Sequence, residues 1–85
     1  MAYEILDPIE FTSGGLFRQE DFIGRVELYD WARFSEKQVL VRGCSTVFPP
    51  WAFMYLAVRL VPHARSIRYG NEHDHILVYR RPKSL

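Results

Sequence analysis

Apolar and polar positions along the 85 residues follow two different periods. In two segments, residues 19–31 and 51–61, apolar side chains recur every three to four positions, which is the spacing of a helix face. Short β-branched or apolar runs elsewhere favour strands instead. These runs are residues 16–17, 38–44, 65–69 and 76–80. The pattern predicts an α/β fold, a small mixed and largely parallel sheet of order β-α-β-α-β-β with two helices.

The clearest unit is the strand–loop–helix between Val39 and Pro62. Its strand ends at Gly43, and Pro50 stands where the first turn of a helix tolerates proline. The helix after it is apolar nearly all round, with Arg59 as its only charge, so we expect it to be covered on more than one side. The last strand follows a short polar loop, which favours antiparallel pairing with its predecessor.

A joint of small and polar residues, Thr12-Ser13-Gly14-Gly15, divides the chain. We therefore predict an N-terminal arm at residues 1–13 and one α/β domain at residues 14–85. Three interpretations of residues 1–9 stay open: an edge strand, a loose arm and a partner-binding segment.

Charge is distributed unevenly. Residues 1–30 hold seven acids and two bases, whereas residues 31–85 hold nine bases and three acids. Such opposed halves neutralise each other within one chain or between two copies. The single cysteine excludes an intramolecular disulfide, and the sequence shows neither a signal peptide nor a membrane-length apolar run. We expect a cytoplasmic protein.

The loop after the first long strand is the candidate ligand site, because open α/β sheets bind ligands where a strand ends and a helix begins. Its residues are Gly43, Cys44, Ser45, Thr46, Pro50 and Trp51. Two interpretations of Cys44 stay open, a thiol of lowered pKa acting on a small molecule and a small buried hydrophobe. The chain offers no placed base, and we favour the second interpretation and a protein that is not an enzyme.

Two further clusters have simpler explanations. His73 and His75 lie beside two carboxylates, but two ligands at this spacing fit a polar hairpin loop better than a metal site. Basic and aromatic residues interleave near the C-terminus, yet no nucleic-acid motif accompanies them. They are Arg65, Arg68, Tyr69, Tyr79, Arg80, Arg81 and Lys83. We expect no metal, no cofactor and no nucleic-acid partner.

The second helix is the candidate interface. A small domain with 15% aromatic residues gains from burying apolar surface against a second copy. The interface residues that we expect are Trp51, Phe53, Met54, Tyr55 and Val58. The sequence thus favours a homodimeric accessory or protein-interaction module over a small-molecule or thiol-dependent enzyme, with nucleic-acid binding third.

Several motifs spread over residues 14–82 resemble those of a family of uncharacterised bacterial proteins, a family of domains of unknown function. They include Gly43-Cys44-Ser45, Pro50-Trp51-Ala52-Phe53-Met54 and Ser66-Ile67-Arg68-Tyr69-Gly70. The resemblance implies no activity. It implies an architecture in which a typical member carries two similar copies of the domain, whereas this chain is a short, single-copy member. A homodimer would restore the interface between the two copies.

Overall fold

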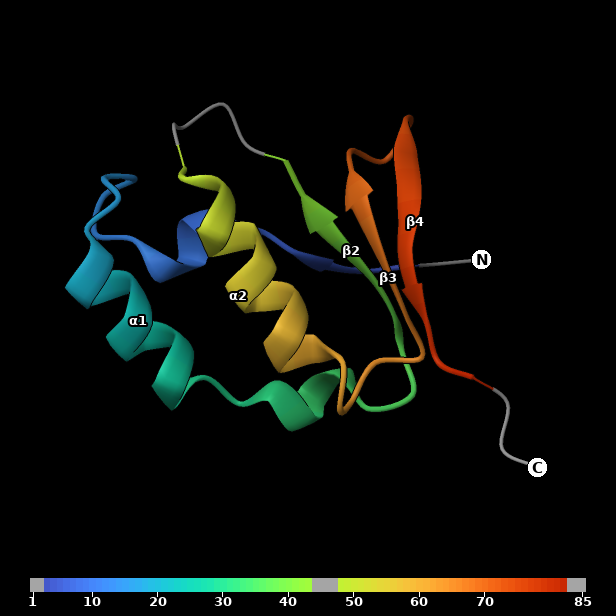
Figure 1. The fold of residues 1–85 in the computed structure, drawn as a ribbon. Coiled ribbons are helices and arrows are strands. Elements are labelled where there is room, and N and C mark those ends of the chain that lie inside the picture. Colours follow the sequence, from blue (N-terminus) through green and yellow to red (C-terminus); the bar gives the residue numbers. More distant parts are fainter. Residues whose placement is uncertain (1–2, 44–47, 83–85) are drawn as a thin grey trace.

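The structure is a computed structural model, and it describes residues 3–43 and 48–82. Four strands form one sheet, and two α-helices and two short 3₁₀ helices connect them (Figure 1). The elements are β1 (Glu4–Leu6), η1 (Pro8–Phe11), α1 (Gln19–Leu28), η2 (Trp31–Phe34), β2 (Gln38–Arg42), α2 (Pro50–Leu60), β3 (Ser66–Gly70) and β4 (His75–Arg80).

The strands lie in the order β1-β2-β3-β4. β1, β2 and β3 are parallel, and β4 is antiparallel to β3, with one register shift beside Ile67 and Arg68. The predicted mixed, largely parallel α/β sheet with two helices is confirmed, as is the antiparallel pairing of the last strand.

One strand prediction was wrong. The first strand is β1 and not residues 16–17, where Leu16 makes only an isolated bridge to Ser13. Asp7 ends β1 by capping η1, since its carboxylate accepts from Ile9 N at 3.1 Å, and Pro8 opens the 3₁₀ turn. Of the three interpretations of this segment, the edge strand is the one seen, and it covers Glu4–Leu6.

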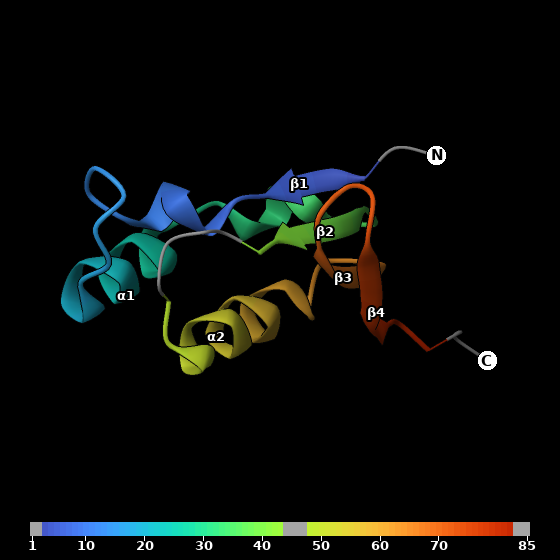
Figure 2. The ribbon, with the colours of Figure 1, turned by 90° about the horizontal axis from the view of Figure 1, so that it is seen from above.

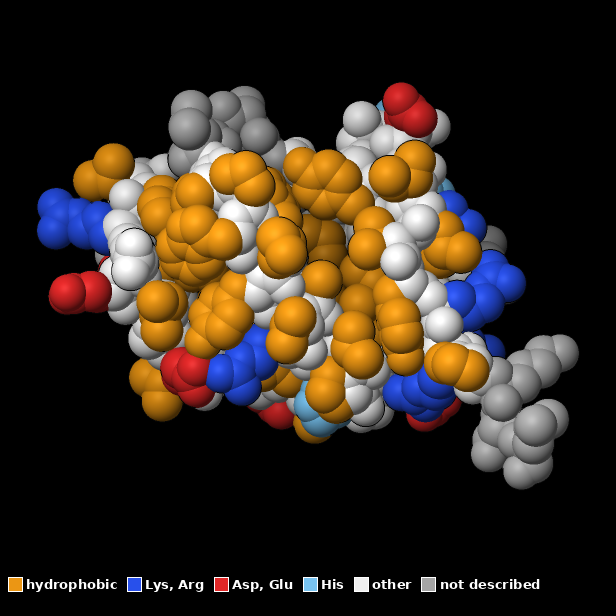
Figure 3. Space-filling model, in the orientation of Figure 1, with side chains coloured by type: hydrophobic (Ala, Val, Ile, Leu, Met, Phe, Trp, Pro, Cys, Tyr) orange, Lys and Arg blue, Asp and Glu red, His pale blue; other side chains and the backbone are white. Residues whose placement is uncertain are grey.

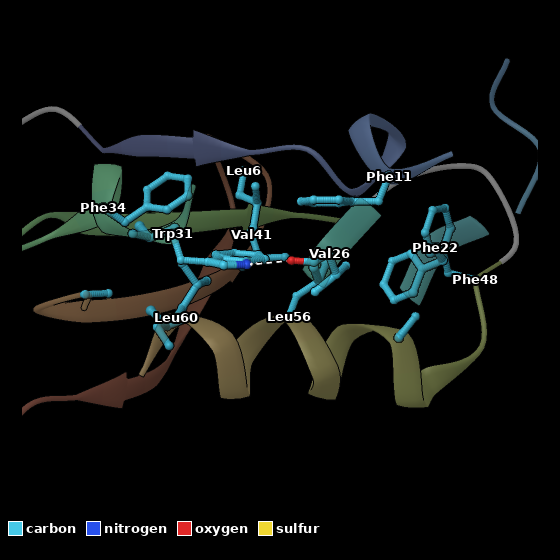
Figure 4. Close-up of a cluster of buried hydrophobic side chains, with 14 residues drawn as sticks. Leu6, Phe11, Phe22, Val26, Trp31, Phe34, Val41, Phe48, Leu56 and Leu60 are labelled. Carbon is cyan, nitrogen blue, oxygen red and sulfur yellow. Dashed lines mark hydrogen bonds between the residues drawn. The ribbon is translucent and has the colours of Figure 1, made fainter. Parts of the chain in front are cut away.

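Both helices cover the same face of the sheet (Figures 1 and 2). Val39 and Val41 point from β2 into a core that Phe22 and Val26 of α1 fill from one side. Ala52, Leu56 and Leu60 of α2 fill it from the other side (Figure 4). Leu40 points to the opposite face, where its neighbours on β1 and β3 are Ile5 and Arg68.

The first helix ends three residues earlier than the periodicity predicts. Trp31 follows in η2 and returns to α1, where its ring N–H donates to the buried Val26 carbonyl at 2.9 Å (Figure 4). Its ring also stacks on Phe11, which the segment predicted as an N-terminal arm supplies to the core. In the part of the chain that is described, no helix is long and apolar enough to cross a bilayer.

Candidate functional site

The second long helix carries apolar side chains on two sides. Ala52, Leu56 and Leu60 are completely buried, in agreement with the 3.6-residue period of a core-facing stripe. A second stripe consists of Trp51, Met54, Val58 and Val61, of which Met54 and Val58 are 68% and 65% exposed. Within residues 3–43 and 48–82, the fold buries the first stripe and leaves Met54 and Val58 of the second stripe largely uncovered.

The exposed stripe continues on to the β3–β4 hairpin. Phe53 of α2 meets Tyr69 of β3 edge-to-face at 5.1 Å between ring centroids, and Ile76 and Val78 of β4 are exposed beside Tyr69. We call the combined surface the apolar face. It consists of Trp51, Met54, Val58, Val61, Tyr69, Ile76 and Val78. Figure 3 shows hydrophobic side chains spread over α2 and on to the hairpin.

A groove lies within the apolar face, between α2 and the hairpin. Its volume is about 300 Å³, and every residue that lines it is apolar or aromatic. The lining residues are Val41, Pro50, Phe53, Met54, Ala57, Ile67, Tyr69 and Val78. A shallower depression on the other side of Met54 reaches Ile23 of α1. Exposed apolar surfaces of this composition favour burial against other apolar surfaces.

A polar bridge beside the apolar face fixes α2 against α1. The Tyr55 hydroxyl donates to the Glu27 carboxylate at 2.6 Å, and the Arg59 guanidinium donates to the same carboxylate. The Tyr55 hydrogen bond and the Arg59 charge hold the pKa of Glu27 below its usual range. This bridge and the Arg42–Asp7 ion pair each join an acid of the first third to a base of the remainder within one chain.

A comparison with protein-family models shows which family the sequence matches. The model described as a protein of unknown function (DUF2480) matches residues 4–81 of the 85. The chain belongs to this family. The predicted membership of a family of unknown function is therefore confirmed. No curated protein and no solved structure matches the chain.

Three residues of the predicted ligand loop, Cys44, Ser45 and Thr46, lie outside the described residues of this DUF2480 member. Of the remaining residues of the loop, Gly43 lies before that segment and Pro50 and Trp51 lie after it. Gly43 is half-buried at the end of β2, where its N–H donates to the Gly70 carbonyl at 2.8 Å, and Pro50 is the exposed first residue of α2. Trp51 belongs to the apolar face.

The histidines of the hairpin point to different surroundings. His73 is exposed, whereas His75 is half-buried, with its ring against Tyr3 and its Nδ1 atom 3.3 Å from Arg68 Nη1. Among residues 3–43 and 48–82, no group of three His, Cys, Asp or Glu side chains could hold a metal ion.

The C-terminal arginines are partly engaged within the fold. Arg81 pairs with Glu36 and donates to the His63 carbonyl, and Arg68 lies over the Tyr3 ring. Arg65 and Arg80 are exposed and line a depression near the end of β4. Lys83 falls outside the described residues.

Of the five expected interface residues, Trp51, Met54 and Val58 are exposed, and Phe53 and Tyr55 are half-buried against neighbours within the chain. Sequence reasoning missed the contribution of Tyr69, Ile76 and Val78 to the apolar face. One signal was present: residues 76–78 form a continuous apolar run, whereas a strand with one solvated face alternates apolar and polar residues.

Proposed function

We propose that this protein is a non-catalytic interaction module that forms a homodimer through the apolar face. The observation that carries the proposal is the size of that face. Large apolar side chains present roughly 150–250 Å² each when fully exposed. The exposed fractions of its seven residues therefore amount to on the order of 700 Å², about an eighth of the 5700 Å² accessible surface.

This area exceeds the roughly 300–600 Å² of the largest apolar patch on a typical monomer. It also approaches the roughly 800 Å² that each partner buries in a standard protein–protein complex. A second copy is the occupant that we infer, since two identical apolar faces are matched in size and in character. The single cysteine supports action in the cytoplasm, because small extracellular domains are usually disulfide-rich.

Sedimentation velocity over a range of protein concentrations tests the proposal. We expect the wild-type chain to sediment as a dimer at micromolar concentration. Met54→Glu and Val58→Glu place a carboxylate at the centre of the apolar face, and each is expected to give a monomer. Leu28→Glu is the matched control, because Leu28 is 89% exposed on α1 outside the apolar face. A wild-type monomer throughout the concentration range contradicts the proposal.

A second candidate function, binding of a small apolar molecule, is favoured by the groove, whose 300 Å³ reaches the lower end of ligand-pocket volumes. Ala57 lines the groove, so Ala57→Phe would fill it. Titration with a medium-chain fatty acid, followed by the ring resonances of Phe53 and Tyr69, tests this candidate. Saturable shifts in the wild type that disappear in Ala57→Phe support it, and unchanged spectra oppose it.

A further inference from the structure

A polar depression lies at the end of the sheet, beside the last residues of β4. Its volume is about 440 Å³, which falls within the range of roughly 300–1,000 Å³ that ligand pockets have. Arg65, Arg80 and Arg81 line it, and Glu36 is the single acid among its described lining residues. Three guanidinium groups and one carboxylate give the depression a net charge of +2.

Two of the three guanidinium groups have no counter-charge in the described part of the chain. Arg65 and Arg80 are exposed, and neither forms an ion pair within residues 3–43 and 48–82. Guanidinium groups that border one depression repel one another, and an anion bound between them offsets that repulsion. Each group also presents its N–H donors in a planar fork that matches the oxygens of a phosphate.

The third guanidinium group is held in place by the backbone. Arg81 pairs with Glu36 and donates to the His63 carbonyl at 2.8 Å. The Glu36 N–H donates to the same carbonyl at 3.0 Å, and Glu36 has a φ of +62°, which non-glycine residues rarely adopt. The His63 carbonyl thus fixes both members of the ion pair, and this wall of the depression is preorganised for a ligand.

A buried hydroxyl group supplies a further donor. Ser66 lines the depression and is only 5% exposed, and no hydrogen bond joins its hydroxyl to another of the residues that the structure describes. Ile67 and Tyr79 pack against the core. Their neighbours Ser66 and Arg80 face each other across β3 and β4 and therefore point to the opposite face of the sheet, away from the helices.

We propose that this depression binds a small phosphate monoester. Its net charge of +2 matches the dianion that such a compound carries above about pH 6. Arg65 and Arg80 donate to the phosphate oxygens, Ser66 adds its hydroxyl, and the volume leaves room for the organic group of the ester. The depression lies outside the apolar face, so this inference is independent of the proposed homodimer.

Titration with phenyl phosphate in a phosphate-free buffer at about pH 7.5 tests the site. We expect saturable shifts of the Ser66 and Arg81 backbone amide resonances. Arg65→Gln and Arg80→Gln each remove a fork of charge-assisted donors and are expected to weaken binding at least about ten-fold. Arg18→Gln is the matched control, because Arg18 is exposed before α1 and does not line the depression. It loses the same charge and should bind as the wild type does, and circular dichroism shows whether each variant folds.

Three further probes define the class of ligand. Benzenesulfonate has the same ring but a single negative charge, and inorganic phosphate has the charge without the organic group. We expect both to bind more weakly than phenyl phosphate, as should a single-stranded oligonucleotide, whose phosphodiesters are singly charged. Binding of phenyl phosphate should also weaken as the pH falls below about 6, where the ester takes up a proton.

Several results would overturn the proposal. Phenyl phosphate that gives no saturable shifts, or that binds both arginine variants as tightly as the wild type, removes the site. Equal or tighter binding of any of the three other probes removes the phosphate monoester as its ligand. Met54→Glu should bind phenyl phosphate with wild-type affinity, because Met54 does not line the depression. A wild-type monomer that binds phenyl phosphate as described contradicts the homodimer alone.

Discussion

At the scale of single residues, adding a side chain is expected to have opposite effects on stability at two glycines. Gly70 ends β3 with a φ of +141°, and a Cβ atom there would lie 2.3 Å from the Asp74 carbonyl oxygen. Gly70→Ala is therefore expected to destabilise the fold by about 2–4 kcal/mol, since both the conformation and the backbone contact exclude a side chain. Unfolding in urea at one protein concentration measures the change.

The matched control is Gly24→Ala. Gly24 is exposed in the middle of α1, and nothing lies within 4 Å of the position that a Cβ atom would take. Alanine should therefore stabilise the helix by about 0.5–1 kcal/mol through its higher helix propensity. A Gly70→Ala variant that is as stable as the wild type contradicts the close contact at Gly70, and a destabilised Gly24→Ala variant contradicts the open position of Gly24.

The sequence predicts such local features better than it predicts distant contacts. Pro50 at the start of α2 and the polar loop before β4 are chemical signals confined to a few residues, and the structure has both where they were expected. Trp31 shows the opposite case. Its periodicity assigns it to the first helix, but its buried hydrogen bond to the Val26 carbonyl requires the chain to leave that helix first. The pattern of apolar positions gives no indication of this hydrogen bond between Trp31 and Val26.

At the scale of elements, the bridge between α1 and α2 predicts a pH dependence. Because Tyr55 and Arg59 lower the pKa of Glu27 from 4.5, the ionised bridge stabilises the fold above that unfolded value. The stabilisation is lost as the pH falls through the still lower pKa of the folded state. Tyr55→Phe removes the largest cause of the shift. We therefore expect it to raise the pKa of Glu27 and to reduce the loss of stability as the pH falls below 4.5.

Carboxyl chemical shifts of Glu27 against pH measure the first effect, and urea unfolding at several pH values measures the second. In a Glu27→Gln background, Tyr55→Phe should leave the pH dependence of unfolding unchanged, because the titrating partner is gone. A Glu27 pKa that does not move in Tyr55→Phe contradicts the assignment of the hydrogen bond as its main cause.

The candidate site shows why elements are easier to predict than their exposure. Both stripes of α2 are apolar, so the pattern identifies a helix without saying which stripe faces the core. The fold buries the stripe of Ala52, Leu56 and Leu60 and leaves Met54 and Val58 of the other stripe exposed. Similarly, the unbroken apolar run of β4 is typical of a central strand, and only the strand order places it at an edge.

At the scale of the whole molecule, association and folding share one equilibrium. If the native state is a dimer and the unfolded state is monomeric, mass action stabilises the native state as the protein concentration rises. For a domain of this size, a hundred-fold rise in concentration is expected to raise the melting temperature by roughly 5–10 °C. Calorimetry or circular dichroism across that range measures the shift.

The interface variants make this prediction specific to the apolar face. Met54→Glu removes association and, since Met54 is mostly exposed, removes few contacts within the monomer. Its melting temperature should therefore be independent of concentration and should fall below that of the wild type only when the protein is concentrated. Leu28→Glu should retain the full concentration dependence. If Met54→Glu lowers the melting temperature equally at every concentration, Met54 stabilises the monomer itself, and its exposed position would not be part of an interface.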